Sequence, residues 1–223
     1  HDHVFGPLGM NHSTDTDAEY QANPDHARPH SRSSGPIHGL GTQTALDENA
    51  TIAQNAAPAG GLAISANDMS RWLLTQLGHG KIPGSEKRLF SDEQSEQMWN
   101  GVVVTPVPHY PVEFAAAQPH YNLYALGWDR SDYRGAQVVG HDGAVLGSQA
   151  TVALLPDKNI GIFIAANSED GEIIRGLLYE LMDHYLGYPQ NQWPEKWRKF
   201  KIDRLTAAAK QVQTVAAKPA NVG

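Results

Sequence analysis

The sequence predicts an α+β protein in which an antiparallel sheet is combined with amphipathic helices. Two strand-like runs, 148–155 and 160–167, are separated by the turn sequence 156–159 (Pro-Asp-Lys-Asn), which is typical of an antiparallel hairpin. The run 161–166 is almost continuously apolar, which predicts a strand covered on both faces. An amphipathic helix is expected over 172–186, and we expect its apolar face to pack on the sheet. That face consists of Ile173, Leu177, Leu181 and Tyr185.

The region before the sheet is expected to contain loops and then a helix. Residues 1–60 are rich in Gly, Pro, Asn, Asp, Ser and His and predict loops and short turns over a scaffold. The helix is expected over 63–78, with Ser65 as its N-cap, Asp68 in the capping-box position and Gly78 at its end. Its apolar stripe at helical spacing consists of Met69, Trp72, Leu73 and Leu77.

A second helix is expected to begin after Ser91, a favourable N-cap, and to run to about Trp99. A proline-rich link follows, and strands are expected at 121–128 and 136–139, before the hairpin.

These elements suggest three parts of the chain. We expect a loop-rich and helical subdomain over 1–119, the antiparallel sheet and its helix over 120–200, and a tail or linker over 201–223.

Composition excludes several classes of function. The 223 residues carry a formal net charge of −7, which argues against nucleic acid or an anionic membrane as the main partner. There is no cysteine, so disulfides and thiolate metal sites are excluded. No run approaches the length of about 18 apolar residues that a transmembrane helix needs. A cysteine-free chain suits a periplasmic or secreted protein, although a cytoplasmic location also stays open.

The chain begins at His1 with neither Met nor a signal peptide, so a natural N-terminus is not expected there. The histidines of the first forty residues do not predict a metal site. His26 and His30 are four residues apart, but Pro29 between them opposes the helix that would align them. We expect solvated loop histidines and neither metal nor cofactor. No Gly-x-Ser-x-Gly elbow is present either, which argues against an α/β-hydrolase nucleophile.

Three sequence blocks, in order, carry a family resemblance. They are Phe-Gly-Pro-Leu-Gly-Met at 5–10, Pro-Ala-Gly-Gly-Leu at 58–62 followed by Ser65 and Asp68, and Tyr-Ala-Leu-Gly-Trp at 124–128 with Gly-His-Asp-Gly at 140–143 and the hairpin ending at Asn167. Together they resemble class C β-lactamase-like serine hydrolases of the β-lactamase and penicillin-binding-protein superfamily. Ala125 is a departure, because the family usually has Gly there. The resemblance implies a β-lactamase/transpeptidase-like fold, with part of the helical domain, that is incomplete without upstream strands.

The resemblance also implies a mechanism. The family nucleophile lies in a Ser-x-x-Lys motif and is assisted by Tyr-x-Asn, and neither motif occurs in these residues. We therefore expect both in a missing N-terminal segment, which would be this chain's partner, and we expect the chain alone to be inactive. The complete enzyme would form an acyl-enzyme with an ester, amide or β-lactam carbonyl. β-Lactamases, D-Ala-D-Ala peptidases and esterases share this scaffold, so the substrate and the oligomeric state stay open.

Five residues are expected at the site. By resemblance, His141 occupies the Lys/His position of the third family motif, Gly143 lets substrate approach the strand, and the backbone N–H of Ala144 is the second oxyanion-hole donor. These three are the candidate catalytic residues. Asp142 and Tyr124 are candidate substrate-binding residues, although strand alternation points Asp142 away from His141 and favours a structural role.

Two alternatives accompany this interpretation. His141, flanked by glycines, could be a turn residue between two strands. The whole chain could also be a non-catalytic module that keeps the fold to bind a peptidoglycan fragment or a protein partner. The sequence immediately before His1 would distinguish such a module from a hydrolase.

Overall fold

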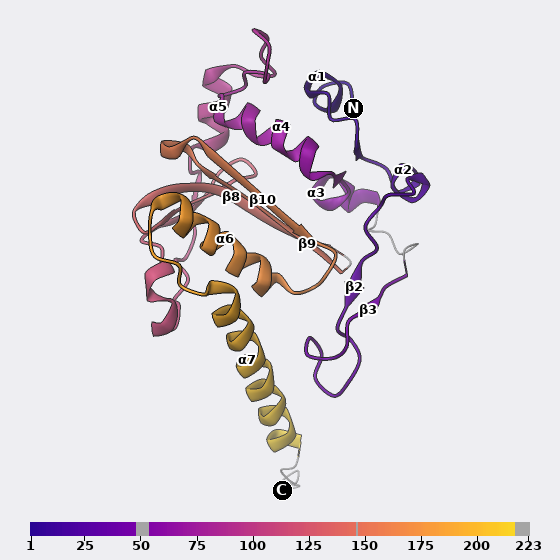
Figure 1. Ribbon diagram of the computed structural model, residues 1–223, viewed down its shortest axis with the longest axis vertical. Helices are drawn as coiled ribbons and strands as arrows, with labels where there is room; N and C mark the ends of the chain where they lie inside the picture. The colour runs from indigo at the N-terminus through magenta and orange to yellow at the C-terminus, as the bar shows by residue number, and fades with distance from the viewer. Residues whose placement is uncertain (48–53, 146, 217–223) are drawn as a thin grey trace, which may run out of the picture. The chain divides into compact units, whose positions relative to one another are not determined.

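The computed structural model describes residues 1–47, 54–145 and 147–216 (Figure 1). Its described residues form two compact units, each assembled from separated segments. The first unit draws on His1–His26, Thr51–Gly143 and Ala150–Ala165, and the second on Ala27–Ala50, Ala144–Gln149 and Ala166–Gly223. This division differs from the expected one at residue 119, because segments distant in sequence join the same unit.

The main sheet has six strands in the order β10-β9-β8-β7-β6-β5. Neighbouring strands β5 to β8 are antiparallel. The expected hairpin is present, and its turn ends at Asn159, which adopts a left-handed conformation with φ 52°. The strands are β5 Val103–Val104, β6 Asn122–Tyr124, β7 Asp129–Tyr133, β8 Ala136–Val145, β9 Ser148–Leu155 and β10 Ile160–Ala166.

Three strand predictions need correction. The strand expected over 121–128 ends at Tyr124, because the chain turns through Gly127, at φ 77°, and returns as β7. Sequence reasoning missed β7, whose Asp-Arg-Ser-Asp-Tyr sequence has no apolar alternation and which is held by pairing on both sides. The strand expected over 136–139 continues to Val145. In β10 only Ile162 is fully buried, since β10 is an edge strand of this sheet.

The two helices expected in the first unit are confirmed. Helix α4 (Ala66–Leu77) begins after Ser65, whose hydroxyl accepts the Asp68 N–H, and α5 (Asp92–Trp99) begins after Ser91 in the same way. The predicted stripe of α4 enters the core of this unit. That core contains Leu73, Trp99, Ala125, Trp128, Val139 and Leu154, with Met69, Trp72 and Leu77 packed against it.

The N-terminal residues of the first unit are short elements held by a small core and by one buried carboxylate. The core contains Phe5, Leu8 and Met10. Asp68 is 3% exposed and accepts hydrogen bonds from the His12 N–H and the Ser13 hydroxyl, both at 2.7 Å. The elements are α1 Phe5–Leu8, β1 Ser13–Thr14, α2 Asp17–Ala22, η1 Gln54–Ala56, α3 Ala57–Gly60 and β4 Ala63–Ile64, with β1 and β4 antiparallel. A further short helix, η2 (Val112–Ala117), lies in the proline-rich link before β6.

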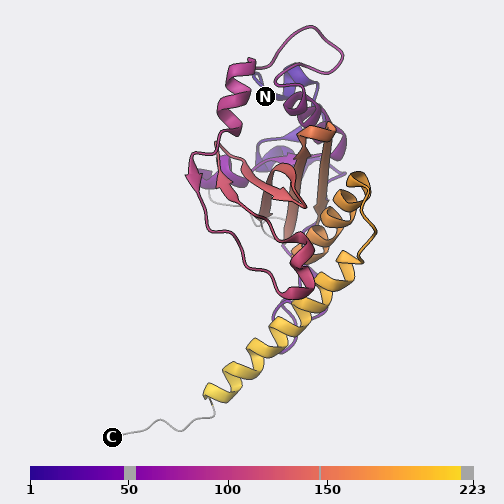
Figure 2. The same ribbon diagram turned by 90° about the vertical axis from the view of Figure 1, so that its left-hand side faces the viewer.

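The second unit contains two long helices and a short antiparallel pair, β2 (His30–Ser31) and β3 (Thr44–Ala45). Helix α6 (Gly171–Leu186) packs against α7 (Trp193–Ala216), and the C-terminal half of α7 extends beyond α6 (Figure 2). The contact is fixed by the buried Trp193, whose indole N–H donates to the Asp183 carboxylate at 2.7 Å. Residues 201–216, expected as a tail or linker, instead form part of α7, and 217–223 lie outside the described residues.

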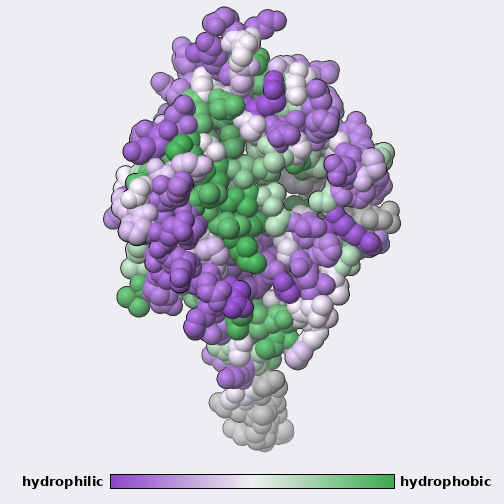
Figure 3. All heavy atoms as spheres, in the orientation of Figure 1, coloured by the Kyte–Doolittle hydropathy of each residue, from purple (hydrophilic) through white to green (hydrophobic). Residues whose placement is uncertain are grey.

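The apolar residues expected to be buried on α6 are not its buried residues. The four residues expected in contact with the sheet are 36% to 48% exposed, and Figure 3 shows apolar side chains gathered over α6. The buried positions of α6 are Ile174, Gly176, Met182 and Asp183. The helix has apolar residues on two adjacent faces, and α7 packs against one of them. The contact is close, because a side chain at Gly176 of α6 would collide with Pro194 of α7. Among the described residues, no helix combines the length and apolarity needed to cross a membrane.

Candidate active site

The Gly-His-Asp-Gly segment lies in the middle of strand β8. The pairing of β7 with β8 runs from Tyr133–Ala136 to Asp129–Gly140, so the segment from His141 onward continues past the first residue of β7. His141, Asp142, Gly143 and Ala144 are all exposed, whereas Val139 and Gly140 are buried. The alternative that His141 is a turn residue is therefore wrong, since it belongs to a continuous strand with an accessible surface.

The two glycines of this segment differ in their surroundings. A Cβ at Gly140 would lie 2.6 Å from the backbone oxygen of Val152, so only hydrogen fits there. A Cβ at Gly143 would meet nothing within 4 Å. Gly143 is therefore not required by the packing of the described residues, which leaves room above the strand for a bound molecule.

His141 and Tyr124, both expected at the site, are in direct contact. The Tyr124 hydroxyl lies 3.2 Å from His141 Nε2, and the two rings meet edge to face with centroids 6.0 Å apart. On its other side, His141 Nδ1 lies 2.7 Å from the backbone oxygen of Asp142. Both ring nitrogens are thus hydrogen-bonded, and the imidazole has a defined orientation on an exposed surface.

The Asp142 side chain is engaged with the neighbouring strand. Its Oδ1 accepts a hydrogen bond of 2.6 Å from the hydroxyl of Thr151, a buried residue of β9. This contact favours the structural role that strand alternation suggested for Asp142. Sequence reasoning did not identify Thr151, whose position opposite Asp142 depends on strand register.

Asp129, the first residue of β7, is a further acidic group beside the pair. Partial burial raises the pKa of Asp129, the charge of His141 acts in the opposite direction, and the Asp142 carboxylate raises it further. Asp129 follows the Tyr-Ala-Leu-Gly-Trp block directly, so adjacency to that block was the only sequence signal for it. The site thus combines an imidazole and a phenol with two carboxylates.

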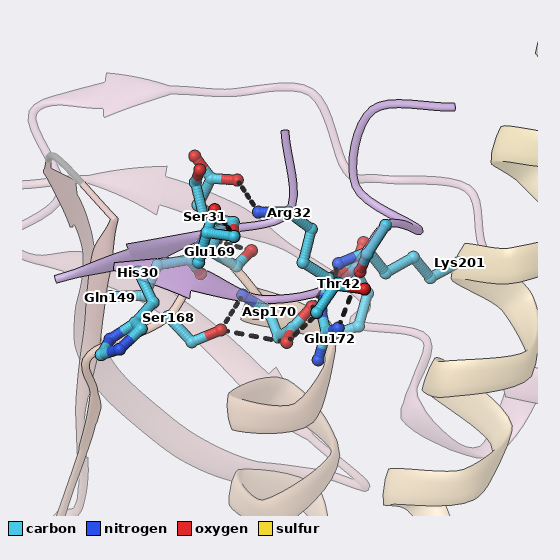
Figure 4. Close-up of polar contacts among 12 residues, drawn as sticks. His30, Ser31, Arg32, Thr42, Gln149, Ser168, Glu169, Asp170, Glu172 and Lys201 are labelled. Atoms are coloured by element: carbon cyan, nitrogen blue, oxygen red, sulfur yellow. Dashed lines mark hydrogen bonds and ion pairs between the residues drawn. The ribbon is translucent and has the colours of Figure 1, made fainter. Parts of the chain in front are cut away.

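A second polar cluster lies in the second unit, around Asp170 (Figure 4). Its carboxylate is hydrogen-bonded by Arg32, by Lys201 at 2.6 Å and by the Ser168 hydroxyl. Burial acts to raise the pKa of Asp170, but these hydrogen bonds outweigh it and hold the pKa below its ordinary value. The cluster borders a hollow of about 420 Å³. Because its charges are paired with one another, we interpret it as a structural tie between the β2 segment, α6 and α7.

Two other polar features occur elsewhere among the described residues. Asn167, the residue that follows β10, donates to the backbone oxygen of Arg28 at 2.8 Å. Among the described residues, His1, Asp15 and Glu19 place one potential ligand atom each within 4.8 Å of one another. All three are exposed, and grouping of this kind is common on protein surfaces without a bound ion.

The chain is similar to a known protein family and to two hydrolases. A family model described as Beta-lactamase matches residues 1–178 of the chain. Two fungal proteins are similar over shorter stretches. Unguisins hydrolase ungD of Aspergillus violaceofuscus (strain CBS 115571) is 37% identical over 79 residues, which are 33% of this chain and 14% of that protein. Unguisins hydrolase ungD' of Aspergillus campestris (strain IBT 28561) is 30% identical over 106 residues, 44% of this chain and 18% of that protein.

A solved structure agrees in fold. The octameric penicillin-binding protein homologue from Pyrococcus abyssi matches with a TM-score of 0.65 and 20% identity, over 85% of this chain and 37% of that chain. The chain therefore spans less than half the length of each of these proteins. The expected fold class, a mixed α and antiparallel β structure of the β-lactamase/transpeptidase type, is confirmed.

Proposed function

The chain belongs to the β-lactamase family, and on that premise we propose that it supplies one wall of a serine hydrolase active site. The nucleophile, in Ser-x-x-Lys, and its Tyr-x-Asn partner would come from polypeptide outside these 223 residues, which contain neither motif. The serine would attack an ester, amide or β-lactam carbonyl, and water would then hydrolyse the acyl-enzyme.

In this proposal His141 faces the reacting centre. Its imidazole would hydrogen-bond the substrate or a catalytic oxygen and would bias proton transfer there. Gly143 would let the substrate lie against β8, and the backbone N–H of Ala144 would donate to the oxyanion. A donor of that kind contributes roughly 2.7–4 kcal/mol in related acyl transfer. Tyr124 and Asp142 would border the bound molecule.

The observation that carries the proposal is the accessible strand segment itself. His141 and Gly143 lie two residues apart on an exposed part of β8, and the space where a Gly143 side chain would project is open. The similarity to two proteins named as hydrolases supports hydrolysis over simple binding.

The exposed stripe of α6 supports the need for further polypeptide. Ile173, Leu177, Leu181 and Tyr185 recur every four residues, which places them on one side of the helix, and all four are more than one-third exposed. An apolar stripe of this length on a surface marks a contact with another chain or segment. We propose that the nucleophile-bearing segment, or an element joined to it, covers this stripe.

The test is denaturing intact-mass analysis after treatment with a fluorophosphonate probe, performed on protein isolated together with its tightly bound partners. A probe adduct on a heavier or second species would support a shared active site. No adduct on any species, with the 24.3 kDa chain unlabelled, would contradict the hydrolase and favour a binding module. An adduct on the isolated chain would contradict the proposal that the nucleophile lies elsewhere.

A further inference from the structure

Strands β6, β7 and β8 align Tyr124 with the Gly-His-Asp-Gly segment of β8. The register pairs Tyr124 with Asp129 and Asp129 with Gly140, so these three residues form one row across the sheet. His141 is the next residue of β8 after that row. Tyr124 therefore belongs to β6, with β7 between it and β8, and its phenol extends across β7 to lie 3.2 Å from His141 Nε2. This approach is specified by the sheet register, because a slip of one residue would move Tyr124 to the other face.

The hydrogen bonds of His141 determine where the neutral ring carries its proton. The backbone oxygen of Asp142, 2.7 Å from Nδ1, can only accept. Nδ1 must therefore carry the hydrogen, and Nε2 of the neutral ring is an acceptor. It follows that the Tyr124 hydroxyl donates to Nε2 while the ring is neutral.

We propose that Tyr124 is a positioning residue: its hydroxyl bonds Nε2 of the His141 ring, whose Nδ1–H tautomer the Asp142 backbone oxygen sets, and thereby controls which hydrogen bonds the site offers to a ligand. With the neutral ring, the Tyr124 hydrogen is directed at His141, so the phenol oxygen presents only lone pairs outward. When the ring is protonated, Nε2–H donates to the phenol oxygen, and the Tyr124 hydrogen turns outward as a donor. The pair thus accepts from a ligand N–H or O–H in one state and donates to a ligand carboxylate or carbonyl in the other.

The surroundings favour this exchange between donor and acceptor. Tyr124 is 37% exposed and His141 is exposed, so a ligand can reach the pair. The acidic groups nearby are Asp129 of β7, on which the charge of His141 acts, and Asp142 of β8, the residue after His141. Thr151, the contact from β9, is neutral and engages Asp142.

The orientation can be measured on the 223-residue chain by ¹⁵N NMR of the histidine side chains, with the His141 signals assigned from the variant His141→Gln. We expect the Nδ1–H tautomer for the neutral ring in the unmodified chain. In Tyr124→Phe the ring ¹⁵N signals should shift, because Nε2 loses its donor. Tyr121→Phe, which removes a phenol hydroxyl three residues earlier, should leave them unchanged. An Nε2–H tautomer in the unmodified chain, or unchanged signals in Tyr124→Phe, would overturn the assignment.

The catalytic consequence rests on the proposed function, and the two can fail separately. In the complete hydrolase, Tyr124→Phe should shift the pH dependence of kcat/KM, a change that a purely structural loss would not produce. If the NMR result holds but His141→Ala leaves acyl transfer unaffected, the proposed function fails and the positioning role stands. If the NMR result fails while His141→Ala abolishes acyl transfer, only the role of Tyr124 is overturned.

Discussion

Gly140 and Gly143 lie three residues apart on β8, yet a side chain would meet the backbone of β9 at the first and open space at the second. The first glycine is therefore explained by close packing of strands. At the second, the packing of the described residues does not require glycine. This difference agrees with the proposal that Gly143, unlike Gly140, borders bound substrate.

Replacing Gly143 with Val should leave stability nearly unchanged but impair the hydrolase. Substitutions at exposed positions usually change the unfolding free energy by no more than about 0.5 kcal/mol. The new side chain would occupy the space proposed for substrate, and we expect kcat/KM to fall about tenfold or more, equivalent to about 1.4 kcal/mol.

Gly140→Ala is the matched control: its Cβ would overlap Val152, and we expect a loss of about 1–3 kcal/mol in stability. Chemical denaturation and steady-state kinetics would measure the two effects. An unstable Gly143→Val protein, or one with full activity, would contradict this account.

The carboxylate of Asp68 should be important for the first unit although it lies far from the candidate site in sequence. It is buried and accepts hydrogen bonds from the N-terminal segment, at the His12 N–H and the Ser13 hydroxyl. In Asp68→Ala both donors lose their acceptor, and each unsatisfied buried group costs about 1–3 kcal/mol. We expect the midpoint of urea unfolding, measured by tryptophan fluorescence, to be lower in Asp68→Ala than in the unmodified chain. Asp68→Asn keeps one oxygen acceptor and should lose less. Equal losses in the two variants would show that the hydrogen bonds are not the cause.

Asp170 should make the second unit sensitive to acid. Burial acts to raise its pKa, but the hydrogen bonds from Lys201, Arg32 and Ser168 prevail and depress it in the folded state. A depressed pKa stabilises the fold at pH values above the ordinary aspartate pKa of about 3.9, and this stabilisation is lost as the pH falls through the lower folded pKa. The stability difference between the unmodified chain and Asp170→Asn should therefore be largest near neutrality and should shrink below about pH 4.

The control for this experiment is Glu195→Gln. Glu195 pairs with Arg198 on the surface of α7, where both side chains are more than half exposed. Solvent-screened pairs contribute little, so this variant should follow the unmodified chain at every pH. Urea unfolding at a series of pH values from 7 to 3 would supply the comparison. A stability difference for Asp170→Asn that is independent of pH would contradict the ionic role of Asp170.

The sequence predicted the elements whose signals are local. Ser65 and Ser91 cap their helices as expected, because a capping hydroxyl and the N–H that it binds lie three residues apart. The face of α6 could not be predicted in this way. Its apolar residues follow two overlapping stripes, and the contact between Gly176 and Pro194 on another helix decides which stripe is buried.

The candidate site shows the same limit. The motif identified His141 and Gly143 as candidates, since it lies within four consecutive residues, but the strand predicted over 136–139 ended before both of them. The contacts of Tyr124 with His141 and of Thr151 with Asp142 join different strands. Such contacts depend on register, and register here passes through β7, which sequence periodicity did not reveal.

His141→Ala should lower kcat/KM of the complete hydrolase by roughly 10²–10⁴-fold, the range for loss of a general acid or base. Folding should be preserved, because the side chain is exposed and its hydrogen bonds are at the surface. His141→Lys should retain more activity than His141→Ala, because lysine can still donate a hydrogen bond at this position. His120→Ala is the histidine control: that ring is 78% exposed and bonded to Asp132, and its loss should leave kcat/KM within about twofold of the unmodified protein, below 0.5 kcal/mol. Equal activities in the His141→Ala and His120→Ala proteins would mean that the exposed imidazole of β8 takes no part in acyl transfer.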